Sequence, residues 1–454
     1  MLNPANGSVI SECPDTPASV LDEAVAAAKR AQPGWAKLPA AARAKHLHAL
    51  AAAIRTWQEE IARAISEEQG KILATSRAEV ASTADYIDYM AEWARRIEGE
   101  IIPSDRAGET IFLFRTPVGV VAGVLPWNYP FFLFARKMAP ALVTGNTIVI
   151  KPSEETPNNA GLFAEIIAQS ELPPGVANVV YGRGGTVGAA LSGHPDVDLI
   201  TFTGSTRAGT AIMAAASKNI TKVNLELGGK APAIVMDDAD IDLAVRAVRD
   251  SRLTNSGQIC NCAERVYVQE RVAGEFIGKL SDAFGAVSYG DPLGADPGMG
   301  PLVNRAAVER IQGMVDRAVA DGAQVRAGGQ SDNRGGGCFF QPTVLANCRQ
   351  DMEIMHEEVF GPVAPVHVFR DLDEAIAKAN DCQYGLTSSI YTRDLKTAIR
   401  ACHEIQFGET YINRENFEAI QGFHAGWRKS GIGGADGKHG VHEFTQTHVV
   451  YLQI

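Results

Sequence analysis

The alternation of strand-like and helix-like segments restricts this chain to a small set of folds. Short β-branched runs occupy residues 147–150, 176–180, 199–202 and 222–227, and amphipathic stretches before and between them occupy residues 131–142, 158–170, 186–192 and 206–217. Strands that alternate with helices in this way form an open, mostly parallel sheet with helices on both faces. We therefore predict an α/β protein.

A second alternating block extends from about residue 231 to residue 431. Its strand signals lie at residues 233–236, 266–268, 324–327, 363–369 and 388–391, and its helix signals at 243–254, 272–284, 304–320 and 372–380. Such a block has the length of a further domain. The chain of 454 residues is long enough for two or three domains.

The segments outside these blocks have different patterns. Residues 19–96 are rich in Ala, Arg and Glu and predict several amphipathic helices with a break at Pro33. Residues 110–125 are β-branched and predict one or two strands. Residues 447–452 predict a strand whose edge must be covered, by another subunit or by a strand of the same chain.

Charge and cysteine content exclude several classes of partner. The net charge is −11, from 42 basic and 53 acidic residues, which argues against nucleic acid or an anionic membrane as the main partner. Seven Cys without regular spacing predict no disulfide framework and a reducing compartment. No apolar run reaches roughly 18 residues, and residues 1–14 lack a signal-peptide pattern, so we expect a cytoplasmic protein.

Cys260 and Cys262 follow a turn at Gly257, between the helix-like residues 241–254 and the strand-like residues 266–268. A thiol at such a junction can lie near backbone N–H groups and be partly exposed, which suits a nucleophile. The alternative is a buried, inert cysteine. The pair is not a zinc signature, because no second Cys or His pair follows at ligand spacing, and we predict no metal site.

Five further motifs accompany this stretch. They lie at residues 126–130 (Pro-Trp-Asn-Tyr-Pro), 151–154 (Lys-Pro-Ser-Glu), 202–206 (Phe-Thr-Gly-Ser-Thr), 226–230 (Glu-Leu-Gly-Gly-Lys) and 358–362 (Glu-Val-Phe-Gly-Pro). Together with residues 257–260 (Gly-Gln-Ile-Cys), they resemble the aldehyde dehydrogenase superfamily over nearly the whole chain. Within it, residues 259–265 and 413–427 resemble the members that oxidise lactaldehyde.

The resemblance implies three structural parts. An open, mostly parallel sheet forms an NAD-binding domain from residues 1–107 and 126–227, and residues 228–431 form a second α/β catalytic domain. Residues 108–125 and 432–454 form a β-hairpin arm for homo-oligomerisation, as a dimer or tetramer. Family members carry a further N-terminal strand before residues 3–5, so we expect the first domain to be truncated at that edge.

Oxidising an aldehyde to an acid needs a nucleophile, an oxyanion donor, a hydride acceptor and a base. The position in the motif assigns the nucleophile to Cys260, although geometry alone leaves Cys262 open. Asn128 is the expected oxyanion donor, worth about 10²–10³ in rate; a turn residue is the alternative. Glu226 is the expected base for thioester hydrolysis, unless it pairs with Lys230.

Residues that bind NAD are expected near several strand ends. Residues 182–188 approach a Gly-x-Gly-x-x-Gly turn but place Val187 at the third glycine, which is a weak signal. Ser205 is better placed, because it can cap a helix whose N–H groups face a pyrophosphate. The alternative is a plain capped helix.

The remaining cofactor residues follow from strand position and from the resemblance. Lys151 and Glu154 end the strand at residues 147–150, where a carboxylate binds the adenosine ribose hydroxyls and repels a 2′-phosphate. This favours NAD over NADP. The resemblance places Trp127, Glu358 and Phe360 at the cofactor, the last two at the nicotinamide ribose and ring; a solvated acidic pair is the alternative for Glu358.

The expected substrate pocket departs from the common family pattern. At positions where many members carry aromatic residues, this chain has Arg136, Glu418 and His424, and Asn261 follows the nucleophile. Long apolar aldehydes would leave these groups unpaired at roughly 1–3 kcal/mol each. We therefore expect a short hydroxyaldehyde such as lactaldehyde or glycolaldehyde. For each residue, an ion network within the tail loop is the alternative.

Other functions stay open from the sequence. A semialdehyde dehydrogenase would use Arg136 to bind a distal carboxylate. An acylating, CoA-dependent enzyme is disfavoured by the hydrolytic base at Glu226. A structural or binding protein on a dehydrogenase scaffold is disfavoured by the complete set of Cys260, Asn128 and Glu226.

Overall fold

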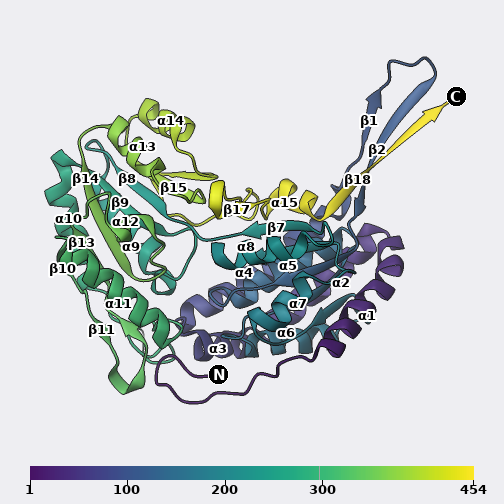
Figure 1. Ribbon diagram of the computed structural model, residues 1–454, viewed down its shortest axis with the longest axis horizontal. Coiled ribbons are helices and arrows are strands. Elements are labelled where there is room, and N and C mark those ends of the chain that lie inside the picture. Colours follow the sequence, from purple (N-terminus) through teal and green to yellow (C-terminus); the bar gives the residue numbers. More distant parts are fainter. Residues whose placement is uncertain (296) are drawn as a thin grey trace.

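A computed structural model describes residues 1–295 and 297–454 of the chain. The described residues form two α/β bodies side by side and an arm that projects from the first body (Figure 1). Both bodies follow the strand–helix alternation of the sequence, so the predicted fold class is confirmed.

The first body is built on a sheet of order β17-β7-β6-β3-β4-β5. Its strands are β3 (Val120–Val124), β4 (Thr147–Lys151), β5 (Ala177–Val179), β6 (Leu199–Thr203), β7 (Lys222–Glu226) and β17 (Gly431–Ile432). All neighbours are parallel except β17, which runs antiparallel to β7. Every residue of β3, β4 and β6 is buried, as expected for parallel strands covered on both faces.

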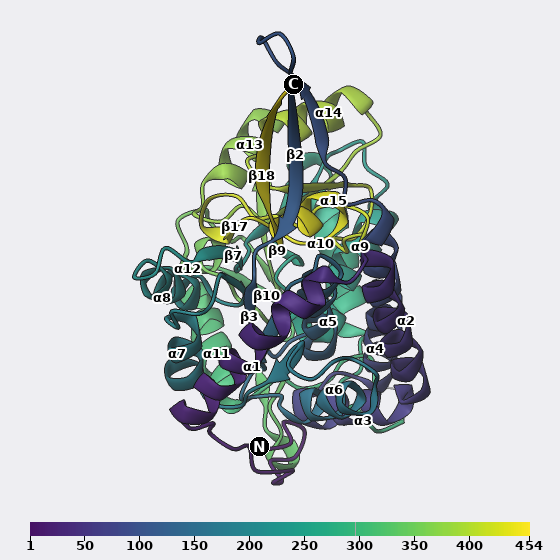
Figure 2. The ribbon, with the colours of Figure 1, turned by 90° about the vertical axis from the view of Figure 1, so that its right-hand side faces the viewer.

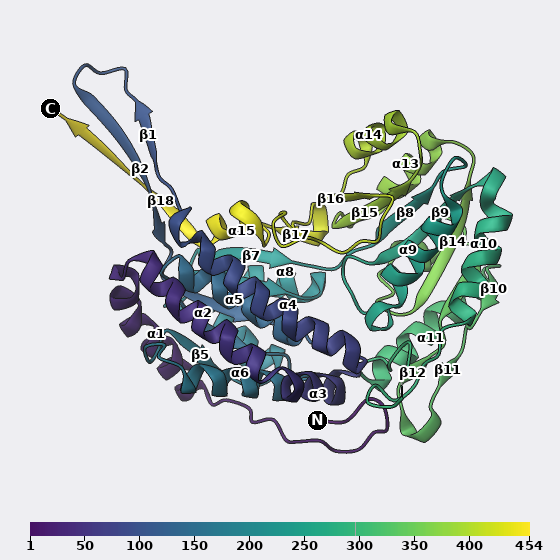
Figure 3. The ribbon, with the colours of Figure 1, turned by 180° about the vertical axis from the view of Figure 1, so that it is seen from behind.

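Helices cover the two faces of this sheet. They are α1 (Ala18–Lys37), α2 (Ala40–Thr56), α3 (Gln58–Gln69), α4 (Leu73–Glu92), α5 (Pro130–Val143), α6 (Asn158–Gln169), α7 (Ala189–Ser192), α8 (Thr206–Ala216) and α15 (Gly437–Glu443). Ile148 and Ile150 point into a core shared with α2, α4, α5 and α6, whereas Val149 points into a core shared with α1, α7 and α8. Helices α2 and α4 lie side by side (Figure 3).

The second body is built on a sheet of order β10-β13-β14-β9-β8-β15-β16. Its strands are β8 (Ala231–Val235), β9 (Ala263–Gln269), β10 (Gln324–Ala327), β13 (Thr343–Ala346), β14 (Val363–Phe369), β15 (Thr387–Tyr391) and β16 (Glu409–Ile412). Only the pairing of β10 with β13 is antiparallel among them. A short pair, β11 (Ser331–Asp332) and β12 (Phe339–Phe340), lies apart from it.

The helices of the second body also cover both faces. They are α9 (Ile241–Leu253), α10 (Glu270–Gly285), α11 (Arg305–Ala320), α12 (Glu353–His356), α13 (Leu372–Asn380) and α14 (Leu395–Glu404). Phe276 of α10 packs with α9 on one face, and Ile311 of α11 packs with α13 and α14 on the other.

The arm has different boundaries from those predicted. It consists of β1 (Glu100–Pro103), β2 (Glu109–Pro117) and β18 (Thr445–Gln453), which pair antiparallel in the order β1-β2-β18 and project together (Figure 2). Strand β3, predicted as part of the arm, is instead a central strand of the first sheet. β17 and α15 likewise belong to the first body, where Val441 and Phe444 enter its core.

Two local predictions were also wrong. Helix α1 continues through Pro33, so this proline does not break it. Residues 184–188 form a single π-helical turn before α7, rather than the start of a regular helix at Thr186.

Candidate active site

Two glycines allow the main chains of separate sequence motifs to approach closely. A Cβ built on Gly229 would lie 2.3 Å from the carbonyl oxygen of Cys260, and a Cβ on Gly257 would lie 2.3 Å from the carbonyl oxygen of Gly361. Side chains at either position would collide with main chain. The segments that contain Glu226, Cys260 and Glu358 therefore meet at one place between the two bodies.

The turn before Cys260 has an unusual backbone. After α9 ends at Leu253, Asn255, Ser256 and Gly257 adopt φ values of 50°, 58° and 71°. Hydrogen bonds hold this turn, because Ser256 Oγ donates to the Gly300 carbonyl at 2.8 Å and Asn255 Nδ2 donates to the Asn128 carbonyl at 3.1 Å. Strained backbone of this kind concentrates at functional sites.

The two candidate thiols lie in different environments. Cys260 is partly exposed, whereas Cys262 is fully buried. Arg252 Nη1 donates to Cys262 Sγ at 2.9 Å, and burial raises the pKa of Cys262 to about 12. Cys262 is thus a protonated packing residue, and the structure leaves Cys260 as the accessible thiol.

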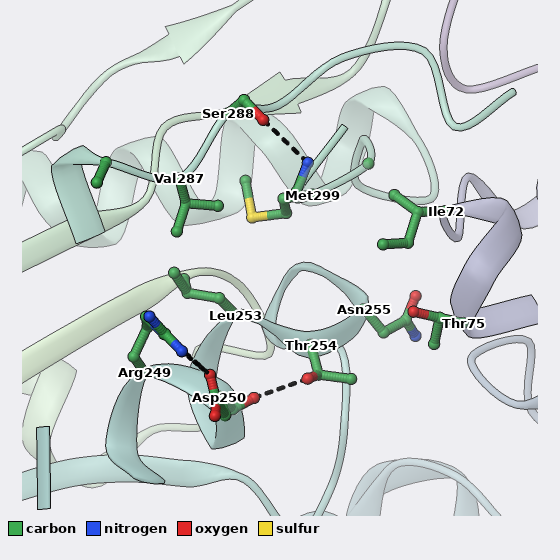
Figure 4. Close-up of a pocket in the computed structure, with 13 residues that line it drawn as sticks. Ile72, Thr75, Arg249, Asp250, Leu253, Thr254, Asn255, Val287, Ser288 and Met299 are labelled. Carbon is green, nitrogen blue, oxygen red and sulfur yellow. Dashed lines mark hydrogen bonds and ion pairs between the residues drawn. The ribbon is translucent and has the colours of Figure 1, made fainter. Parts of the chain in front are cut away.

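A cavity of about 390 Å³ lies behind the same turn (Figure 4). Leu253 and Thr254 line one side, Val287 and Met299 lie across from them, and Ile72 and Thr75 line the end next to Asn255. Cys260 is not among its lining residues. This cavity therefore lies next to the nucleophile turn but is separate from the thiol.

Asn128 reaches the same turn. Its side chain is buried, and its Nδ2 donates to the Gln258 carbonyl at 3.0 Å. Lys71 Nζ donates to the Asn128 carbonyl at 2.9 Å. The amide is therefore held at Gln258, two residues before Cys260.

Glu226 ends β7 and is buried among cations. Lys137 Nζ donates to Glu226 Oε1 at 2.7 Å, and Arg136 Nη1 lies 3.9 Å from Glu226 Oε2. Burial raises the pKa of Glu226, but the charges of Lys137, Arg136 and His424 outweigh it and lower the pKa to about 2. Glu226 is therefore ionised. The alternative pairing with Lys230 was wrong, because Lys230 pairs with Glu264.

Helix α5 positions both of these cations. Glu79 of α4 accepts from the N–H groups of Phe131 and Phe132 at 3.0 and 3.1 Å, which satisfies the first turn of α5. Arg136 and Lys137 follow on the buried part of this helix. Lys137 was missed in the sequence, although it stands next to Arg136.

The predicted substrate residues form one network. Arg136 Nη1 donates to Glu418 Oε1 at 3.2 Å, and Asn261 Nδ2 donates to Glu418 Oε2. His424 Nδ1 lies 2.5 Å from Glu409 Oε1. Burial lowers the pKa of His424, but Glu409 outweighs it and the pKa is raised well above its usual value. The nearby Cys260 also raises the pKa of this ring. Glu409 was missed in the sequence.

The network leaves one polar atom free. Asn261 is 2% exposed, and within residues 1–295 and 297–454 its Oδ1 has no hydrogen-bond partner. Such an atom is a ready acceptor for a hydrogen bond from a hydroxyl group. The ion network that the sequence offered as an alternative is therefore present, and it still presents an acceptor.

The cofactor candidates surround the carboxyl ends of the first sheet. Lys151 Nζ lies 2.9 Å from Glu154 Oε2 at the end of β4, and Glu154 Oε1 accepts from the Gly184 N–H at 3.1 Å. Ser205 caps α8 as predicted, because its Oγ accepts from the Ala208 N–H at 3.2 Å. This edge, with a capped helix and a half-exposed carboxylate, fits an adenosine diphosphate.

The nicotinamide candidates lie on the other side of the Cys260 turn. Glu358 Oε1 accepts from the Gly229 N–H at 2.8 Å, and burial raises the pKa of Glu358 to about 7. The charged form of such a buried carboxylate is stabilised by hydrogen bonds from hydroxyl groups, such as those of a ribose. Trp127 and Phe360 meet edge to face, with ring centroids 5.5 Å apart. The residues present thus fit a nicotinamide dinucleotide.

Glu264 supports this side and was also missed in the sequence. It pairs with Lys230 and Arg252 at 2.7 Å each. It also accepts from the N–H groups of Val359 and Phe360 at 2.9 Å each. Glu264 therefore fixes the backbone that carries Glu358 and Phe360.

An open parallel sheet, a second α/β body and a partly exposed thiol between them define a nicotinamide-dependent oxidoreductase. Residues 1–450 match the aldehyde dehydrogenase family, and the chain belongs to that family. In the described residues, no helix combines the length and apolar character needed to span a membrane. No group of three or more His, Cys, Asp or Glu in the same residues is arranged to hold a metal ion.

Individual relatives cover the whole chain. It is 61% identical over 454 residues to the lactaldehyde dehydrogenase of Escherichia coli (strain K12), covering 100% of this chain and 95% of that protein. The crystal structure of lactaldehyde dehydrogenase from Escherichia coli matches with a TM-score of 0.98 at 61% identity, covering 100% of this chain and 95% of that one. The succinate-semialdehyde dehydrogenase (NADP(+)) of Escherichia coli (strain K12) is 38% identical over 444 residues, covering 98% and 92%.

Proposed function

We propose that this protein oxidises a short hydroxyaldehyde, lactaldehyde or glycolaldehyde, to its carboxylic acid with NAD. One observation carries the substrate class: the charged network of Arg136, Glu418 and His424, with the free acceptor of Asn261, lies beside Cys260. A hydroxyl group satisfies these atoms, whereas an alkyl chain would desolvate them without a partner.

We propose that Cys260 Sγ adds to the aldehyde carbon. The developing oxyanion accepts from Asn128 Nδ2 and from the Cys260 N–H. When bound, NAD supplies the hydride acceptor, with Glu358 and Phe360 holding the nicotinamide end and Lys151, Glu154 and Ser205 the adenosine end. The thioester left on Cys260 is then open to attack by water.

Glu226 is the proposed base for that hydrolysis. Its low pKa keeps it ionised, but the cations that lower the pKa also make the carboxylate a weak base in this arrangement. Because Lys137 holds the carboxylate at 2.7 Å, Glu226 must leave this partner to reach the thioester.

The substrate and cofactor preferences are tested together by NADH or NADPH absorbance. We expect kcat/KM for lactaldehyde and glycolaldehyde to exceed that for hexanal by about tenfold or more for each polar group left unpaired. We also expect NAD to be preferred to NADP, because Glu154 repels a 2′-phosphate. A preference for hexanal would refute the polar pocket.

Product release that depends on CoA would indicate an acylating enzyme, and no turnover by a folded, NAD-binding protein would indicate a non-enzyme.

The arm is proposed to assemble a homo-oligomer. β18 pairs with β2 alone among the described residues. The arm also exposes apolar side chains, including Ile101 (74%), Tyr451 (66%) and Val449 (39%). Exposed edges and apolar patches of this kind are normally covered.

Light scattering at micromolar concentration tests the assembly. We expect a mass at least twice that of one chain, reduced by the double substitution Val449→Lys with Tyr451→Lys, because alternate residues share one face of β18. Substitution of the exposed Leu395 and Ile399 of α14 by Lys is the matched control and leaves the mass unchanged. A monomeric wild-type mass would contradict the proposal.

We propose the cytoplasm as the location. All seven cysteines are free thiols in the structure, which fits a reducing compartment. The proposed partners are a small aldehyde and further copies of this chain, rather than nucleic acid or a membrane. The net charge of −11 agrees with this choice.

A further inference from the structure

Asp436 has a backbone conformation that suits glycine rather than aspartate. Its φ is 72° and its ψ is 163°, a region that is essentially restricted to glycine. The residue is 1% exposed, so its side chain is not there for solubility. Strain of this kind persists only where surrounding contacts fix the backbone, and it concentrates at active sites and ligand-binding sites.

The Asp436 carboxylate is bound to the Arg136 guanidinium. Arg136 Nε donates to Asp436 Oδ1 at 3.0 Å, and Arg136 Nη2 donates to Asp436 Oδ2. This is the bidentate geometry that fixes a guanidinium in one orientation. The remaining nitrogen, Nη1, faces Glu418 at 3.2 Å and Glu226 at 3.9 Å. One guanidinium therefore faces three carboxylates.

The neighbouring cationic side chains are also paired with carboxylates. Lys137 pairs with Glu226 at 2.7 Å, and His424 lies 2.5 Å from Glu409. With Arg136 these are the three cations of the cluster, and its carboxylates are Asp436, Glu226, Glu418 and Glu409. The carboxylates outnumber the cations by one, so the cluster has no cation to offer a negatively charged substrate.

We propose that Asp436 is a positioning residue that sets substrate specificity at this site. Asp436 occupies the Arg136 guanidinium and so prevents it from binding the distal carboxylate of a semialdehyde. It also holds Arg136 Nη1 toward Glu418. The Glu418 carboxylate is thereby kept oriented toward an uncharged, hydroxyl-bearing aldehyde. This inference rests on the proposed function. It also decides against the semialdehyde dehydrogenase alternative for the native chain.

The test compares kcat and KM for glycolaldehyde and succinate semialdehyde in the wild type and in Asp436→Asn. Asparagine keeps the shape but removes the negative charge. We expect the ratio of kcat/KM for succinate semialdehyde to that for glycolaldehyde to rise about tenfold or more. The rise comes mainly from a lower KM for the semialdehyde, because its carboxylate is bound equally in the ground and transition states.

Asp436→Gly is the second variant, and it guards against a folding defect because glycine suits this backbone. It is expected to shift the ratio in the same direction. Asp238→Asn is the matched control, since within residues 1–295 and 297–454 Asp238 accepts only from Thr392, Arg393 and Asp394; its ratio stays at the wild-type value.

The outcomes separate this inference from the proposed function. A wild type that oxidises neither lactaldehyde nor glycolaldehyde would overturn the proposed function itself. An active wild type whose ratio is unchanged in both Asp436 variants, or variants that lose both activities in equal proportion, would show that Asp436 is only structural and would overturn the inference.

Discussion

Replacing Cys260 by Ala is expected to reduce aldehyde oxidation by at least about 10⁴-fold, because the covalent route is lost with the nucleophile. NAD affinity should change little, since the residues that fit the dinucleotide lie on other segments. The measurement is NADH formation with lactaldehyde, together with NAD binding by calorimetry. Retained turnover would contradict the assignment.

The matched control for this substitution is Cys382→Ala. Cys382 is a free thiol with the same intermediate exposure as Cys260, but it lies against Arg265 rather than beside His424. We expect this variant to keep wild-type turnover. Cys262→Ala is less suitable, because it would leave Arg252 with one partner fewer in a buried position.

Replacing Glu226 by Gln is expected to slow hydrolysis of the thioester while leaving its formation largely intact. The expected loss in kcat is about 10²–10⁴-fold, with a burst of NADH close to one per subunit before the slow steady state. Stopped-flow absorbance resolves the two phases. A variant that loses the burst as well would show that Glu226 acts before the thioester forms.

The pKa of Glu226 determines the pH behaviour. Its folded value of about 2 lies below the value of about 4.3 in an unfolded chain. The wild-type base therefore stays ionised through the neutral range. The linked stability is fully present above the unfolded pKa and is lost as pH falls toward the folded value, so Glu226→Gln should flatten this part of the stability profile.

A buried carboxylate outside the network serves as the control for Glu226. Glu68 is 1% exposed and accepts from the N–H groups of Asn158 and Asn159 at 2.7 and 2.9 Å. Glu68→Gln should lower the unfolding temperature without producing a burst. If both variants show the same kinetics, the effect of Glu226 would be one of stability rather than of base catalysis.

Local sequence patterns were enough to predict the two alternating blocks and the turn at Cys260. The predicted helix at residues 243–254 and strand at residues 266–268 correspond to α9 and β9, and the predicted cap at Ser205 is present. These features depend on periodicity and on capping chemistry, which act within a few residues.

The arm boundary shows where a local pattern was misread. Residues 110–125 were predicted as one or two strands and assigned as a whole to the arm, but Gly119 has a φ of 133° and separates β2 from β3. The unbroken apolar run of β3 is typical of a strand buried on both faces. Together, the glycine and the run would have placed β3 in the sheet. The strands β13 and β16 and the helix α14 were also missed.

The ion network could not be derived from local sequence. Arg136 and Asp436 are 300 residues apart, and Lys137 is 89 residues from Glu226. Pairs of this kind exist only once the fold brings their elements together. The backbone strain at Asp436 is likewise set by tertiary contacts, since residues 433–437 (Gly-Gly-Ala-Asp-Gly) indicate only a loop.

The most direct test of the account is to trap the acyl group on the protein. Glu226→Gln mixed with lactaldehyde and NAD, quenched in acid and digested, is analysed by peptide fragmentation in a mass spectrometer. The account predicts one lactyl group in thioester linkage, located on Cys260. A lactyl group on Cys262, or unmodified peptide while NADH is being formed, would contradict it.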